Sequence, residues 1–161
     1  MSALATAPPR RLAPSARRAV LTVHIVASVG LLGEIAGFLV VALRAAASDD
    51  PAVAAASYDL LAIFSAAFGI PLSFLALASG IALGVTSKWG VLRYWWVTAK
   101  LVLLASVILV GALVLGPGVD AMRNGGGGAE TRIVAGAAYD VVVLLVATGL
   151  SVYKPRRRRR T

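Results

Sequence analysis

The chain has no cysteine and a single histidine, His24, among its 161 residues. Without cysteine it cannot form disulfides, thiolate nucleophiles, iron–sulfur clusters or thiolate zinc sites. With one histidine it cannot ligate haem through two histidines of the same chain, so a haem or metal site would need a dimer or a different second ligand. It also lacks a glycine-rich phosphate loop, paired histidines at metal spacing and a serine nucleophile motif. We therefore expect no enzymatic activity, no metal site and no cofactor.

Acidic residues are also scarce. The chain has 7 Asp and Glu against 16 Lys and Arg, which gives a formal net charge of +9. Many of the basic residues flank apolar segments: Arg10, Arg11, Arg17 and Arg18 precede the first segment, and Lys154 with residues 156–160 follow the last. Such clusters are typical of topology signals and of contacts with membrane lipids through anionic headgroups. This placement predicts a lipid partner at the cytoplasmic face and argues against binding to nucleic acid.

Apolar residues make up 59% of the chain and gather in four long segments. The segments are residues 20–43, 60–85, 95–115 and 133–152. A hydrocarbon core about 30 Å thick is crossed by a helix of about 20 apolar residues. No segment has a periodic polar face, which favours spanning the membrane over lying on its surface. We therefore predict an all-α fold, a membrane-embedded four-helix bundle over residues 19–153.

The charges outside the apolar segments predict the orientation. Residues 1–18 form a basic tail, the second loop carries Lys88 and Arg93, and residues 154–161 form a polyarginine tail. The first and third loops mix basic with acidic residues. Because basic segments stay on the cytoplasmic side, the pattern predicts a multi-pass cell-membrane protein with both termini inside and both tails disordered. An aromatic and basic cluster at the inner end of the third helix then supplies interface anchors, namely Trp89, Arg93, Tyr94, Trp95 and Trp96.

Helix boundaries are indicated by a few residues. Asp59 is suited to cap the second helix, and Pro71 allows that helix to kink. The Gly116-Pro117-Gly118 run is expected to end the third helix. Residues 125–128 are four consecutive glycines, which predict a flexible tip.

Small residues recur at four-residue spacing in the first two helices. Gly33 and Gly37 share one face of the first helix, and Ala76, Gly80 and Gly84 share one face of the second. Such faces let helix backbones approach closely in lipid. The pattern fits packing within one chain or a possible homodimer seam, and both interpretations stay open.

Four ionisable residues lie inside the apolar segments: His24, Glu34, Lys100 and Asp140. A charge at mid-bilayer costs about 2.5–3.5 kcal/mol on insertion scales, so each needs a partner, water or neutralisation. At about 1.5 Å rise per residue, His24 and Lys100 fall near the inner boundary. Glu34 and Asp140 fall at a similar level near mid-membrane. The positions predict one possible inner pair and one possible central pair.

Each of these residues also has a structural interpretation. Lys100 can extend its stem to the inner interface near Trp96. His24 can be a packed, hydrogen-bonded histidine. Glu34 can bond to hydroxyl groups, and Asp140 can mark a helix terminus if the fourth span starts later.

One stretch, residues 88–101, reads Lys-Trp-Gly-Val-Leu-Arg-Tyr-Trp-Trp-Val-Thr-Ala-Lys-Leu. Together with residues 21–33, the Pro71-Leu72-Ser73 run and Gly80, it resembles the DUF2269-like family of small four-helix actinobacterial membrane proteins. The resemblance covers roughly residues 20–115. It implies a four-helix bundle with His24, Arg93 and Lys100 in family positions, and it implies no activity. Glu34 lies outside the family pattern.

The leading hypothesis is a non-enzymatic plasma-membrane bundle that acts as an accessory or small-molecule-handling protein. One alternative is a small proton- or cation-coupled transporter in which Glu34 is the exchanging carboxylate. A second is a haem-binding membrane subunit that uses His24.

Overall fold

The computed structural model describes residues 12–86 and 95–153, and every regular element in these ranges is helical. The first helix, α1, covers Pro14–Ala46. The second traverse consists of α2 (Pro51–Phe64), a π-helix η1 (Ser65–Gly69) and α3 (Ile70–Thr86). The third consists of α4 (Trp95–Val110), a π-helix η2 (Gly111–Leu115) and α5 (Gly116–Arg123), and the fourth is α6 (Glu130–Tyr153).

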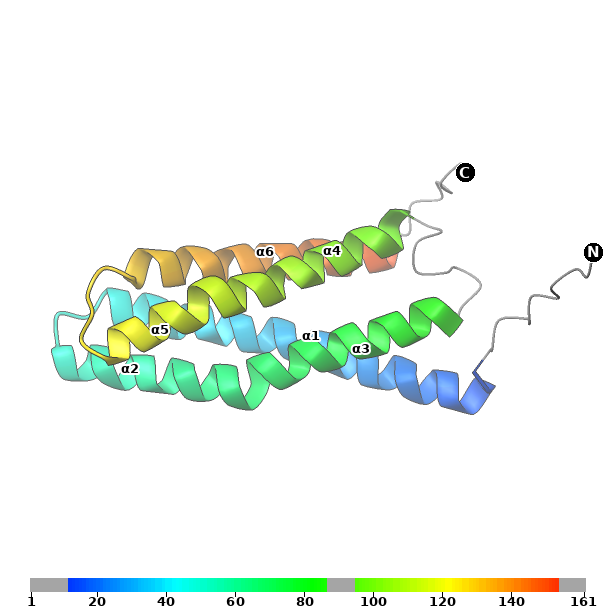
Figure 1. The fold of residues 1–161 in the computed structure, drawn as a ribbon, viewed down its shortest axis with the longest axis horizontal. Coiled ribbons are helices and arrows are strands. Elements are labelled where there is room, and N and C mark those ends of the chain that lie inside the picture. The colour runs from blue at the N-terminus through cyan, green and yellow to red at the C-terminus, as the bar shows by residue number, and fades with distance from the viewer. Residues whose placement is uncertain (1–11, 87–94, 154–161) are drawn as a thin grey trace, which may run out of the picture.

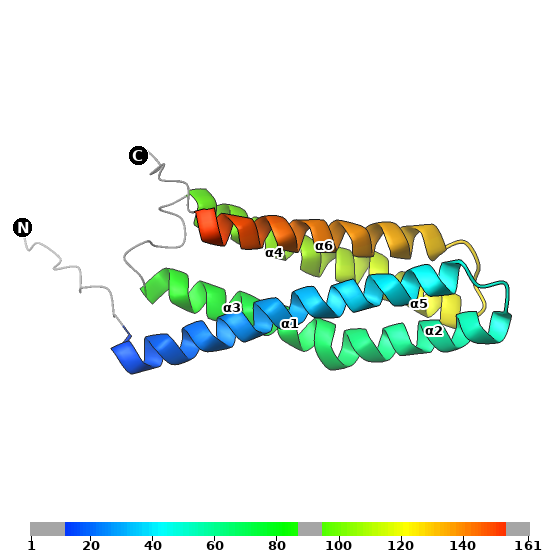
Figure 2. The same ribbon diagram turned by 180° about the vertical axis from the view of Figure 1, so that it is seen from behind.

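All four traverses are long and apolar enough to cross a membrane, which confirms the prediction of an all-α bundle of four spans. Helix α1 packs against α2, α3 and α6, and α4 packs against α6. The start of α1 and the end of α6 lie at the same end of the bundle, as four spans require (Figure 1). We call this the terminal end. The opposite end, which carries the connections 47–50 and 124–129, is the glycine-loop end (Figure 2).

The helices extend beyond the apolar segments that predicted them. Helix α1 begins at Pro14, inside the stretch expected to be a disordered tail. Proline is favoured at the first helical position because its missing N–H has no partner there. Alanine and arginine, which follow it at residues 16–19, are good helix formers.

The second helix is capped by Asp50 and not by Asp59. The Asp50 carboxylate accepts a hydrogen bond from the Ala52 N–H at 2.9 Å, and Pro51 follows it as the first helical residue. This is the arrangement that N-terminal caps favour. The expectation for Asp59 was wrong because the helix starts two turns earlier than the apolar segment. Asp59 therefore lies inside α2.

Both interior prolines follow a π-helix by two residues. Pro71 comes after η1, whose last residue is Gly69, and Pro117 comes after η2, whose last residue is Leu115. A proline has no N–H to donate, and its ring clashes with the carbonyl one turn earlier in an α-helix. The wider π turn is one way to reduce that conflict. The Gly116-Pro117-Gly118 run was expected to end the third helix, but the helix continues to Arg123.

The large apolar core lies in the glycine-loop half of the bundle. The largest fully buried apolar side chains are Phe38 of α1, Leu61 of α2 and Ile133 of α6. Glycines bring the third and fourth traverses close together there. A Cβ atom at Gly136 would lie 2.9 Å from Leu115 Cδ2, and one at Gly118 would lie 2.8 Å from Ile133 Cγ1. Because such distances leave no room for a side chain, these two glycines permit the packing of α6 on η2 and α5.

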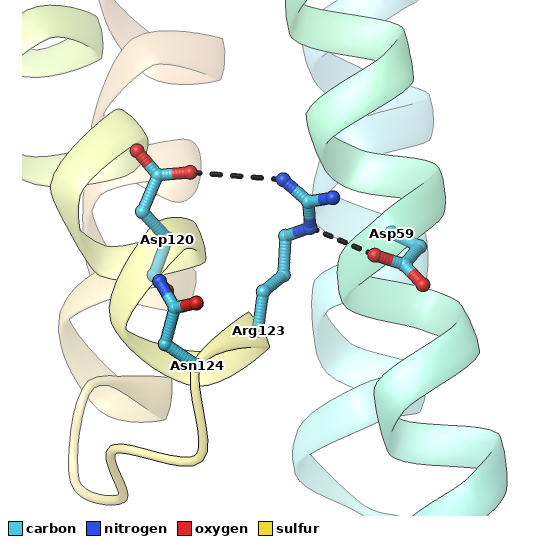
Figure 3. A network of polar contacts seen from close by, with 4 residues as sticks. All are labelled: Asp59, Asp120, Arg123 and Asn124. Atoms are coloured by element: carbon cyan, nitrogen blue, oxygen red, sulfur yellow. Dashed lines mark hydrogen bonds and ion pairs between the residues drawn. The ribbon is translucent and has the colours of Figure 1, made fainter.

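An exposed polar network joins α2 to α5 at the glycine-loop end (Figure 3). The Arg123 Nε donates to Asp59 Oδ1 at 2.7 Å, and its Nη1 lies 3.9 Å from Asp120 Oδ1. The Asn124 side-chain amide donates to the Asp120 carbonyl at 2.8 Å. The network positions the last turn of α5 beside α2. Because its side chains are exposed, we expect a modest contribution to stability.

Candidate functional site

Glu34 lies on the buried face of α1, where Leu31 and Phe38 are its neighbours one turn away on either side. Its side chain is only 9% exposed. The carboxylate rests against Gly69, the last residue of the π-helix η1. A Cβ atom at Gly69 would lie 3.2 Å from Glu34 Oε1 and 3.4 Å from Oε2. The absence of a side chain at Gly69 therefore gives the carboxylate its place against the second traverse.

Asp140 lies in the interior of α6 and is 1% exposed. The helix begins at Glu130, so Asp140 stands about 15 Å along the axis from the helix start. The alternative that Asp140 marks the helix terminus was wrong, because α6 starts earlier than the apolar segment. Its Oδ1 atom is fully buried and has no hydrogen-bond partner among the described residues. A buried polar atom left in that condition costs about 1–3 kcal/mol.

The structure brings Glu34 and Asp140 together. Their carboxyl groups are close enough to interact electrostatically, and each is at least nine-tenths buried. In the part of the chain that the structure describes, neither carboxyl group has a hydrogen bond to a neighbour. Two buried carboxylates within electrostatic range of each other cannot both ionise without a large electrostatic and desolvation cost. The pair can therefore bind a proton.

His24 connects α1 to α3. Its Nδ1 lies 3.1 Å from the Ala76 carbonyl oxygen and 3.0 Å from Ser79 Oγ. Ser79 donates its own hydroxyl hydrogen to the Leu75 carbonyl at 2.6 Å. Both partners of Nδ1 are then available only as acceptors. Nδ1 must therefore donate, so we assign the tautomer in which Nδ1 carries the proton. The ring packs on Gly80, where a Cβ atom would lie 3.1 Å from Cε1.

Lys100 lies in the second turn of α4. Its Nζ donates to Ser151 Oγ of α6 at 3.2 Å and stands 4.8 Å from the centre of the Trp96 ring. The ring face attracts a cation. Lys100 also interacts electrostatically with His24. The terminal half of the bundle thus brings together polar side chains from α1, α3, α4 and α6.

The remaining residues singled out in the sequence are placed as follows. Ala76 and Gly84 are buried, and Gly80 receives His24. Gly37 stands beside Phe64, whereas Gly33 is exposed and a Cβ atom there would meet nothing within 4 Å. Trp96 is buried and Trp95 is 37% exposed. Trp89, Arg93 and Tyr94 lie outside the described residues.

Sequence reasoning missed Gly69 and Ser79. The signal for Gly69 was its position two residues before Pro71, where a proline inside an apolar helix favours a local irregularity. Ser79 had a weaker signal, since it lies one turn after Ala76 on the small-residue face of α3.

The fold and the site define an integral membrane protein with four apolar helices that enclose a small set of polar side chains. The chain belongs to the family described as predicted integral membrane protein (DUF2269), whose model matches residues 18–153. The resemblance seen in the sequence is therefore confirmed, and it extends through the fourth helix. No curated protein and no solved structure matches the chain.

Proposed function

We propose that this protein is a non-enzymatic cell-membrane bundle that binds and releases a proton at the Glu34–Asp140 pair and uses this step to handle a small molecule. One observation carries the proposal: two carboxyl groups are buried on helices that pack against each other, within electrostatic range, and Asp140 Oδ1 has no hydrogen-bond partner in the described chain. A proton on either group removes the repulsion between two buried charges.

A proton suits this donor set better than a metal cation. Calcium takes 6–8 oxygen ligands and magnesium needs a near-ideal octahedron. No group of three or more Asp, Glu, His or Cys side chains gathers anywhere in residues 12–86 and 95–153. Among the described residues, the basic side chains His24 and Lys100 lie toward the terminal end. His24 is about 15 Å from Glu34 along α1.

The depth of the pair supports a role inside the membrane. Asp140 has about 15 Å of helix on one side and about 20 Å on the other, counted from the ends of α6. Ionisable groups at such a depth are characteristic of proton relays and transport pathways. In the same proposal the terminal end faces the cytoplasm, because the basic residues gather there.

Infrared spectroscopy tests the proposal directly. Protonated carboxylic acids have a C=O stretching band that is separate from the carboxylate bands, so a pH titration of the reconstituted protein reports their protonation. We expect a band that titrates in the parent and changes in both Glu34→Gln and Asp140→Asn. Asp59→Asn is the matched control, because that carboxylate is exposed and paired with Arg123. A titrating band that is unchanged in both central variants would contradict the proposal.

Proteoliposomes give the functional measurement. An imposed pH gradient across vesicles that contain the parent should dissipate faster than across vesicles with Glu34→Gln or Asp140→Asn, once the transported molecule is present. If the pH gradient decays equally fast in parent and variant vesicles with every solute tested, the proposal fails. The pair would then have a purely structural role.

A further inference from the structure

Tyr139 immediately precedes Asp140 on α6, and its hydroxyl group donates a hydrogen bond to Ser106 Oγ of α4 at 3.0 Å. The direction of this bond is fixed, because Ser106 uses its own hydroxyl hydrogen for the Leu103 carbonyl at 2.7 Å. Tyr139 therefore joins α6 to α4 at the depth of the carboxyl pair.

The depth of Tyr139 determines what this bond contributes. Its backbone lies about 14 Å along the axis from Glu130, the first residue of α6. Its ring is 44% exposed, on a helix that lipid surrounds. Tyrosine is typical of the membrane interface, where its hydroxyl group meets water, whereas the hydrocarbon core offers a hydroxyl group no partner. Ser106 supplies that partner, so a rotation of α6 that separated the two residues would leave the hydroxyl unpaired.

The position of Tyr139 also determines the position of Asp140. Consecutive residues of an α-helix point in directions about 100° apart. Asp140 is 1% exposed and lies within electrostatic range of Glu34 on α1, and α6 packs against both α1 and α4. A contact that holds Tyr139 at α4 therefore also holds Asp140 on the buried side of α6.

A second close contact at this depth does not fix the rotation by itself. Gly136, one turn before Tyr139 and Asp140, packs on the third traverse. A Cβ atom at Gly136 would lie 2.9 Å from Leu115 Cδ2 and 3.3 Å from Val110 Cγ1. Glycine lets helix backbones approach closely, but it has no side chain that interlocks with the neighbouring helix. The hydrogen bond, by contrast, is directional.

We propose that Tyr139 is a positioning residue for the carboxyl pair: its hydrogen bond to Ser106 sets the rotation of α6 that holds Asp140 within range of Glu34. This inference rests on the proposed function for the role of the pair. The rotation itself is measured without proton movement.

Infrared spectroscopy reports the rotation through Asp140, whose band is the one lost in Asp140→Asn. Tyr139→Phe keeps the ring and removes only the hydroxyl group. We expect a second, displaced Asp140 band, and the ratio of the parental to the displaced band should fall about threefold, because interhelical hydrogen bonds in lipid typically shift such equilibria by that factor. Tyr153→Phe is the matched control, because it removes the same atom from the exposed last residue of α6. It should leave the band unchanged.

Substitutions at Ser106 test the other partner of the bond, and they keep the test available if Tyr139→Phe does not accumulate. Ser106→Ala should produce the same displaced band, and Ser106→Thr, which keeps the hydroxyl group, should retain the parental one. Combining Tyr139→Phe with Ser106→Ala should add nothing, because each change breaks the same bond. The parental band should respond to Glu34→Gln, and the displaced band should not, because it reports a carboxyl group out of range of Glu34.

Two results would overturn the inference. A single, parental Asp140 band in both Tyr139→Phe and Ser106→Ala would show that packing alone fixes the rotation of α6. An Asp140 band that changes equally in Tyr139→Phe and Tyr153→Phe would show that the effect does not depend on Ser106.

The same spectra separate this inference from the proposed function. If the displaced band appears as expected but neither carboxyl group titrates with pH in the parent, the positioning role stands and the proton function fails. If a band titrates in the parent while Tyr139→Phe and Ser106→Ala leave the Asp140 band unchanged, the proton function stands and the positioning role fails.

Discussion

The carboxylate of Glu34 rests on the backbone of Gly69, so that a Cβ atom at residue 69 would lie 3.2 Å from Oε1. Gly69 ends a π-helix that precedes Pro71 by two residues. The irregularity and the acidic side chain therefore meet at one point, and π-bulges frequently occur at functional sites.

Gly69→Ala tests this contact. The added methyl group must displace the carboxylate by a few tenths of an ångström, and overpacking of this kind typically costs about 1–3 kcal/mol. We expect lower thermal stability in detergent and a shifted infrared band for the central carboxyl pair. Gly33→Ala is the control, because it adds the same methyl group to α1 in open space. It should leave the band unchanged and keep or raise stability, since alanine favours helix. An identical effect of both substitutions would show that the contact has no consequence.

The hydrogen bond between His24 and Ser79 gives a second prediction. Ser79→Ala removes one of the two acceptors for His24 Nδ1 and leaves the Ala76 carbonyl. We expect a loss of about 0.5–1.5 kcal/mol in the free energy of unfolding. Ser57→Ala is the matched control, because that hydroxyl bonds only to the Val53 carbonyl of its own helix. A larger loss for Ser57→Ala would show that the bond between α1 and α3 contributes little.

Lys100 gives a third prediction. Its stem reaches Ser151 and the Trp96 ring, and Lys100→Met keeps the length of that stem. Because an extended lysine near a helix end is solvated without a required counter-ion, the variant should accumulate in the membrane at the parental level. Quantitative immunoblotting of membrane fractions measures this. If the variant fails to accumulate, Lys100 has an essential ionic partner.

The ion pair at the glycine-loop end gives a fourth prediction (Figure 3). Arg123 and Asp59 are 43% and 61% exposed in their side chains. A double-mutant cycle with Arg123→Gln and Asp59→Asn should give a coupling energy of about 0.2–1 kcal/mol that decreases with salt. A coupling energy well above this range, or one that is insensitive to salt, would show that the pair is shielded from solvent.

Some features of this fold and site could be predicted from the sequence, and others could not. The four spans were predictable because apolar length alone determines whether a helix can cross a membrane. The similar depth of Glu34 and Asp140 in the membrane was predictable because an α-helix has a constant rise per residue. Whether their side chains faced each other depended on the rotation of α1 against α6, which is a tertiary property. The two π-helices were not predictable, because a proline in an apolar segment is compatible with a break, a kink or a bulge. Asp50 and Asp59 are both plausible caps by type, and only the position of the loop decides between them.

The last prediction concerns Glu34→Gln. Glutamine keeps the shape of the side chain, and its neutral amide can donate hydrogen bonds as a protonated carboxyl group does. It therefore resembles the protonated form of Glu34 but cannot release a proton.

We expect Glu34→Gln to unfold within about 1 kcal/mol of the parent, because no described cation pairs with Glu34 and the substitution conserves volume. Proton movement in proteoliposomes should disappear, while membrane accumulation persists. Retained proton movement would assign Glu34 a static role and leave Asp140 as the exchanging group. A marked loss of stability would contradict both versions, since it would show that Glu34 is ionised and held by a positive charge. The combination of normal stability with lost proton movement is the result that only a proton-exchanging carboxyl pair explains.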